Sequence, residues 1–81
     1  MPRGTLMAKS KLGDNLRALR EEADLSQMEL ATKARITLSN VYQIEQGDIA
    51  DPRMSTLRRL AKALRVTVAE LIGERSIKKG D

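Results

Sequence analysis

The chain has 81 residues, is 41% hydrophobic without any Phe or Trp, and allows one small domain with a thin aliphatic core that dimerisation could support. The absence of Cys excludes disulfides and thiol chemistry, and the absence of His removes the commonest general base and metal ligand, which makes an enzyme the weakest class. The net charge of +4 permits nucleic-acid binding without proving it, and we expect no metal and no cofactor.

Residues 1–10 contain Pro2 and Gly4, show no hydrophobic periodicity and predict a flexible N-terminal segment. They lack the apolar stretch of a signal peptide, and no apolar run in the chain approaches the ~20 residues of a membrane span. We therefore expect a cytoplasmic protein that does not enter a membrane. Two interpretations stay open for Arg3, Lys9 and Lys11, which belong either to a solvated terminus or to an arm along DNA.

Residues 11–23 predict a first helix, because apolar side chains recur there at spacings of four, three and four residues. They form one apolar stripe: Leu12, Leu16, Leu19 and Ala23. Ser26 then opens a second helix at 27–34, with Glu29 three residues further on. This spacing indicates a capping box, in which each side chain accepts the backbone N–H of the other residue.

The second helix combines Leu30, Ala31 and Ala34 on one face, and Ala31 is small enough for a close crossing with another helix. Thr37 is a favourable N-cap for a third helix at 38–46, which Gly47 would end. Its apolar face is Val41 and Ile44. Its opposite face is rich in amides and hydroxyls, which suit hydrogen bonds with base edges: Ser39, Tyr42, Gln43 and Gln46.

Residues 54–64 predict a fourth helix with an apolar stripe and a basic opposite surface, which either attracts DNA or is simply solvated. The stripe is Leu57, Leu60, Ala61 and Leu64, and the basic surface is Arg58, Arg59, Lys62 and Arg65. Thr67 and Glu70 indicate a second capping box at the start of a fifth helix, which Gly73 stops. Residues 74–81 predict a flexible C-terminal tail, so the expected domain spans 11–73.

The order of these features resembles the phage-repressor-like (Cro/CI, XRE-type) helix-turn-helix DNA-binding family. The matching stretches are LSQMELA at 25–31, QIEQG at 43–47, Pro52, TLRRLAKAL at 56–64 and VTVAELI at 66–72. The resemblance covers most of the chain. It implies an all-α, five-helix repressor-like domain in which residues 27–46 form the helix-turn-helix.

The resemblance also places base contacts in the third helix, at Leu38, Ser39, Asn40 and Gln43. A glutamine can pair bidentately with adenine, whereas Leu38 either meets a thymine methyl group or packs beside Val41. The loop after this helix carries Asp48 and Asp51, where family members often have cations. We therefore expect DNA binding to be weaker or to depend on phosphate contacts from other residues: Gln27, Arg35, Tyr42, Gln46 and Arg53. For Tyr42, simple packing at the surface is an equally open alternative.

Three further sets of residues follow from the resemblance. Arg20 and Glu45 stand where the family has a structural ion pair, the alternative being two ordinary surface charges. Arg35 and Arg65 stand where the family usually has glycine, so at Arg35 either the turn differs or a cost of about 1 kcal/mol or more is accepted for a cation near phosphate. A two-fold dimer contact is expected from residues of the last helix and its approach: Val66, Val68, Leu71 and Ile72.

Together these features favour a sequence-specific DNA-binding transcriptional regulator that acts as a homodimer on a roughly palindromic operator in double-stranded DNA. The alternative is an antitoxin or co-regulator whose main partner is another protein. A restriction–modification controller and a phage-type repressor would share this pattern, so the operator and the direction of regulation stay open.

Overall fold

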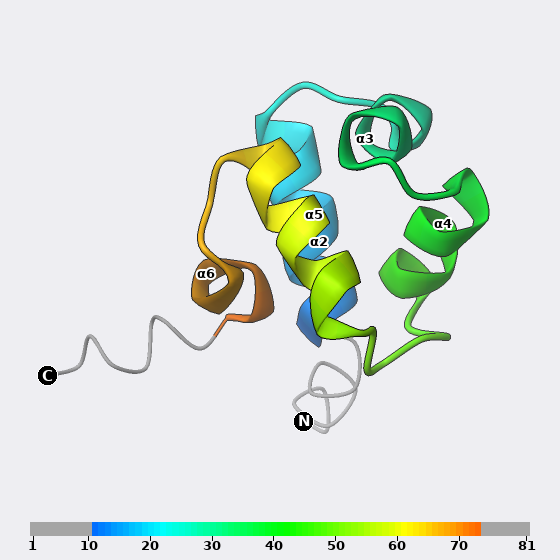
Figure 1. The fold of residues 1–81 in the computed structure, drawn as a ribbon, viewed down its shortest axis with the longest axis vertical. Helices are drawn as coiled ribbons and strands as arrows, with labels where there is room; N and C mark the ends of the chain where they lie inside the picture. The colour runs from blue at the N-terminus through cyan, green and yellow to red at the C-terminus, as the bar shows by residue number, and fades with distance from the viewer. Residues whose placement is uncertain (1–10, 74–81) are drawn as a thin grey trace, which may run out of the picture.

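The computed structural model describes residues 11–73, which form five helices and no strand. The helices are α2 (Lys11–Glu22), α3 (Gln27–Ala34), α4 (Leu38–Gln46), α5 (Met54–Leu64) and α6 (Val68–Ile72) (Figure 1). This confirms the expected all-α fold. The expectations for 1–10 and 74–81 lie outside the described residues. None of the described helices is long and apolar enough to cross a membrane.

The helices α2 and α5 form the middle of the domain, and the other three pack around them (Figure 1). α2 contacts α4 and α6, while α5 contacts α3 and α6. Because α3 also packs on α4, α4 is held by two neighbours, α2 and α3. In Figure 1, α4 and α6 lie on opposite sides of the middle, so the outer face of α4 is directed away from α6.

The core is aliphatic, as the composition requires. All five helices contribute its largest fully buried side chains, each of which stabilises the fold by about 1.5–3 kcal/mol relative to exposure. These side chains are Leu16, Leu30, Val41, Ile44, Leu60 and Leu71.

Two expectations from the sequence are wrong. Ala23 is exposed rather than part of the apolar stripe, because α2 already ends at Glu22. Leu71 was expected at a dimer contact, yet its side chain is 0% exposed within a single subunit. Its packing in the core leaves no surface for a second copy of the chain.

Hydroxyl side chains cap the N-termini of three helices, as the sequence predicted. Ser26 Oγ accepts the backbone N–H of Glu29 at 3.0 Å, and the Glu29 carboxylate accepts the N–H of Ser26 at 2.8 Å. Thr37 caps α4 and Thr67 caps α6, the latter again in a complete capping box. Each such cap contributes about 1 kcal/mol and fixes where its helix begins.

Among residues 11–73, three residues other than glycine have a left-handed backbone: Asp24, Arg35 and Arg65, with φ of 62°, 58° and 60°. Arg35 and Arg65 directly follow α3 and α5, and their N–H groups donate to carbonyls of the last turn. Arg35 therefore has the conformation for which the family uses glycine, and the alternative of a different turn geometry is excluded. The chain accepts a cost of about 1–2 kcal/mol at such a position.

Gly13 lets α2 and α4 cross with their backbones in contact. A Cβ at this position would lie 2.6 Å from the carbonyl oxygens of both Ile44 and Glu45. A glycine inside a helix costs about 1 kcal/mol relative to alanine, and here the close crossing offsets that cost. The sequence analysis did not identify Gly13, because a glycine within a helical pattern does not reveal which element it faces.

We expect Gly13→Ala to destabilise the domain, because the backbone of α4 would have to move away from the added methyl group. Overpacking costs about 1–3 kcal/mol, and the upper end applies where backbone must shift, which exceeds the helix-propensity gain of about 1 kcal/mol. Urea unfolding measures the difference. Ala18→Gly, at an exposed position of the same helix, is the control and should lose about 1 kcal/mol. A stabilised Gly13→Ala protein would contradict the close crossing.

We expect Arg35→Gly to raise the melting temperature, because glycine adopts a φ near +60° without a Cβ clash. A net gain of roughly 0.5–1 kcal/mol corresponds to a rise of a few degrees in a domain of this size. A thermal melt followed by circular dichroism checks this. Arg58→Gly removes the same side chain from an exposed helical position and should lower the melting temperature. If both variants melt lower, residue 35 is not left-handed in solution.

Candidate nucleic-acid interface

The helix α4 has an apolar face against the core and a polar face toward solvent. Val41 and Ile44 are buried, whereas Ser39 and Gln43, one helical turn apart, are exposed, with Asn40 half-buried beside them. Figure 1 shows α4 at the edge of the domain, with α2 and α5 on its inner side. A hydroxyl and an amide are therefore accessible on the outer face, where each can both donate and accept hydrogen bonds.

Two larger side chains extend this outer face. Leu38 and Tyr42 are 42% and 49% exposed and stand one turn apart. Leu38 is therefore not buried beside Val41, and its side chain is available for an apolar contact. The Nε2 group of Gln46 donates to the hydroxyl of Tyr42 at 3.0 Å, which joins two of the residues expected at phosphate.

A buried carboxylate, Glu45, fixes the inner side of α4. It is only 3% exposed, and Arg20 of α2 donates to both of its oxygens, from Nε at 2.6 Å and from Nη2 at 3.1 Å. The hydrogen bond with Glu45 raises the pKa of the Arg20 guanidinium above its ordinary value, so the arginine stays charged. The structure thus contains an ion pair rather than two surface charges.

Further donors tie this ion pair to the start of α3. Arg20 Nη1 donates to the carbonyl oxygen of Leu25 at 2.8 Å, and Gln27 Nε2 donates to Glu45 Oε1 at 3.0 Å. An amide nitrogen carries two N–H groups, so Gln27 keeps one for a phosphate. Arg17 Nε lies 3.7 Å from Glu45 Oε1, and its side chain is 46% exposed.

The sequence analysis missed Arg17, although its position contains a hint. It stands three residues before Arg20 and therefore on the same flank of α2. Because Arg17 Nε and Gln27 Nε2 both lie near Glu45 Oε1, Arg17 is a further, partly exposed cation close to Gln27. Sequence spacing alone could not establish this proximity.

The remaining residues expected at phosphate have different surroundings. Arg53 is exposed at the N-cap of α5 and makes no capping hydrogen bond with its side chain. Arg35 is exposed in the turn before α4, and its carbonyl oxygen accepts from Arg59 Nη1 at 3.1 Å. Within the described residues, neither Arg53 nor Arg35 takes part in the hydrogen bond between Tyr42 and Gln46.

Three of the four residues expected at a dimer contact keep some surface. Val66, Val68 and Ile72 are half-buried and pack against the edge of the core. Val68 and Ile72 belong to α6 and Val66 precedes it, and Figure 1 places α6 across the domain from α4. The structure thus separates the base-reading candidates from the dimer candidates.

Comparison with known proteins places this arrangement among helix-turn-helix proteins. Residues 11–71 match the family described as helix-turn-helix domain. The immunity repressor protein of Bacillus phage phi105 is 37% identical over 68 residues, which cover 84% of this chain and 46% of that protein. No solved structure matches the chain.

Two further relatives are described as a transcriptional repressor and as a putative antitoxin. The HTH-type transcriptional repressor RghR of Bacillus subtilis is 39% identical over 54 residues, covering 67% of this chain and 40% of that protein. The putative antitoxin HigA2 of Mycobacterium tuberculosis is 38% identical over 61 residues, covering 69% of this chain and 60% of that protein. The chain therefore spans less than two thirds of each of these relatives.

The coupling between Arg20 and Glu45 can be measured with a double-mutant cycle. We expect Glu45→Met to destabilise the domain by about 3–5 kcal/mol, because it leaves the charge of Arg20 largely buried without its carboxylate. Combining it with Arg20→Met should recover part of the loss, since that ion pair is then removed as a whole. Urea unfolding of the four proteins gives the coupling energy. Strictly additive losses would show that the pair does not hold α2 and α4 together.

Proposed function

The chain belongs to the phage-repressor-like helix-turn-helix family, and on this premise we propose that it is a sequence-specific DNA-binding transcriptional regulator. In this proposal α4 is the recognition helix and lies in the major groove of duplex DNA. Phosphate contacts from neighbouring residues fix the orientation of the domain, and side chains on the outer face of α4 read the bases.

The observation that carries the proposal is the division of α4 into two faces. The inner face is fixed by buried apolar side chains and by the Glu45 ion pair, while Ser39 and Gln43 remain exposed without a role in packing. Because the inner face holds the backbone of α4 in place, little backbone entropy is lost when its outer face binds. An amide such as that of Gln43 can form two hydrogen bonds with adenine in the major groove.

The roles within the interface follow from chemistry. Ser39, Asn40 and Gln43 would hydrogen bond with base edges, and Leu38 would contact a thymine methyl group. The phosphate contacts would come from donors around α4: Gln27, Arg35, Tyr42, Gln46 and Arg53. Because the Tyr42 hydroxyl already accepts a hydrogen bond from Gln46, its own O–H is available to donate to a phosphate oxygen.

A homodimer is part of the proposal. The half-buried side chains of Val66, Val68 and Ile72 offer an apolar surface at α6 on which a second copy could pack. A two-fold dimer of this kind would bind two half-sites about 34 Å apart in a roughly palindromic operator.

A second candidate function is that of an antitoxin or co-regulator whose main partner is another protein. The relative described as putative antitoxin HigA2 supports this candidate. The two candidates differ in one observable property, because an antitoxin of this kind would copurify with a partner on which its DNA binding depends.

Binding-site selection from a pool of random duplexes tests the main proposal, with the solution mass of the protein measured in parallel. The unmodified protein should enrich one palindromic sequence and have the mass of a dimer. Gln43→Ala should relax the preference at one base position in each half-site, equivalent to a loss of about 1–3 kcal/mol of discrimination. Gln46→Ala is the matched control, since loss of a phosphate contact weakens binding to all sequences about equally.

Two outcomes would count against the proposal in different ways. An unchanged selection profile for Gln43→Ala would mean that this face of α4 does not read bases. A folded protein that binds no duplex even at low salt would overturn the proposed function as a whole.

A further inference from the structure

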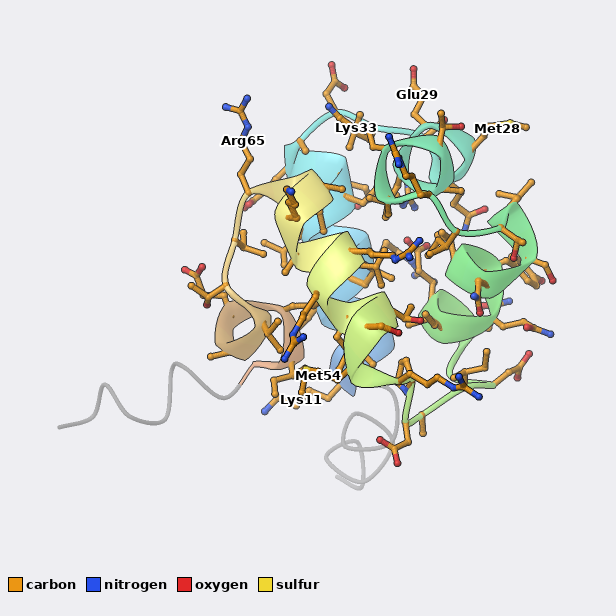
Figure 2. All side chains as sticks on the ribbon, viewed as in Figure 1. Lys11, Met28, Glu29, Lys33, Met54 and Arg65 are labelled. Atoms are coloured by element: carbon orange, nitrogen blue, oxygen red, sulfur yellow. The ribbon has the colours of Figure 1, made fainter. Side chains whose placement is uncertain are left out.

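A concavity of about 660 Å³ lies between the C-terminal part of α3, the turn after it and the C-terminal half of α5. Figure 2 shows Lys33 on α3 and Arg65 directly after α5, both at the surface. From the described part of the chain, five cationic side chains and two alanines line this space, which we call the cationic concavity. Its cations are Lys33, Arg35, Arg59, Lys62 and Arg65.

This concavity gathers half of the positive charge of the domain. Residues 11–73 contain ten Lys and Arg residues, five of which line it. Within the described residues, no carboxylate lines it and none of its cations forms a salt bridge. Like charges placed together repel one another, so the arrangement is stable only at a cost that an anionic ligand would remove.

The backbone supplies an independent observation. Arg35 and Arg65 are both left-handed, at the ends of two different helices, and both line the cationic concavity. Each position would accept glycine at less cost. Two arginines are therefore kept in strained positions at one and the same site.

Stabilisation of helix ends does not account for these arginines. A cation near a helix C-terminus contributes about 0.3–1 kcal/mol, and Lys33 and Lys62 already stand in the last turns of α3 and α5. A left-handed arginine costs about 1–2 kcal/mol, which is more than a second cation at the same helix end would gain. The charge itself is therefore the property that the arginines add.

The lining indicates which kind of anion fits. Protein interfaces rely on buried aromatic and large apolar anchors, whereas the apolar residues that the described part of the chain contributes here are two alanines. Three of the five cations are arginines, whose planar guanidinium groups match phosphate oxygens. Arg59 is also oriented by its hydrogen bond to the carbonyl oxygen of Arg35. These features favour the phosphate backbone of a nucleic acid over an acidic protein.

We propose that the cationic concavity binds the phosphate backbone of the same duplex that α4 reads, beyond the edge of the half-site. Arg35 stands at the border between the two surfaces, two residues before Thr37, the N-cap of α4. Asp48 and Asp51, in the loop at the other end of α4, repel phosphate, and the concavity supplies the attraction that this loop lacks. The inference rests on the proposed function, because it requires that α4 binds DNA.

The test compares salt dependence on two duplexes that carry the selected operator, one ending at the operator and one extended by about one helical turn on each side. The double variant Lys62→Gln with Arg65→Gly removes two cations and also relieves the strain at residue 65. On the long duplex, its plot of log Kd against log salt should be less steep than that of the unmodified protein by about 2, or about 0.9 for each lost phosphate contact. On the short duplex, the two proteins should be alike.

Arg58→Gln is the matched control, because Arg58 is an exposed cation of α5 outside the concavity. This variant should change the slope of log Kd against log salt only slightly, and by the same amount on both duplexes. The inference would be overturned if the double variant changed the slope as little as this control on both duplexes. It would also be overturned if the concavity bound a second, separate duplex instead of the one that α4 binds. Either result would leave the proposed function standing, whereas an unmodified protein that binds neither duplex would end both.

Discussion

Glu45 is a carboxylate held out of water inside a domain that has only a small core. Removing such a charge from water costs several kcal/mol, and only good geometry and several hydrogen bonds can offset this cost. Arg20 supplies two of these bonds and Gln27 a third, with Arg17 nearby. Because the fork of the guanidinium fits the carboxylate in one orientation, the pair selects one arrangement of α2, α3 and α4. The position of α4 thus follows from an electrostatic requirement as much as from its apolar contacts.

The steric fit between α2 and α4 also fixes the position of α4. Gly13 removes the side chain that would hold α2 away from the carbonyl groups of Ile44 and Glu45, so the ion pair and the close crossing act on the same turn of α4. All these constraints act on the inner side of that helix. The outer side, with Ser39 and Gln43, does not contribute to packing, so its residue types are free to serve binding.

Features that depend on neighbours along the chain were predictable from the sequence. The capping boxes at Ser26 and Thr67 and the apolar positions of the helices need only local spacing, and the structure has them as expected. The boundary at Ala23 was missed by one residue, because a helix end depends on how the next turn closes. Leu71 was misplaced, since spacing gives the apolar face of a helix but not whether its own domain covers that face.

Features that join distant parts of the chain were not predictable. Gly13 and Glu45 are far apart in sequence, and so are Lys33 and Lys62, whose shared concavity appears only once α3 and α5 are packed together. For the Arg20–Glu45 pair, the resemblance to a family supplied the expectation. Nothing in the spacing of charges alone would have chosen these two from the other acids and bases of the chain.

The single aromatic side chain of the protein has a practical consequence. The chain contains one Tyr and neither Phe nor Trp, and Tyr42 is half-exposed on the outer face of α4 with its hydroxyl bonded to Gln46. All intrinsic ultraviolet fluorescence therefore originates from this surface. Since the ring is already in contact with water in the native state, its emission is a poor reporter of unfolding. It is well placed, however, to reveal without any attached dye when another molecule covers this helix.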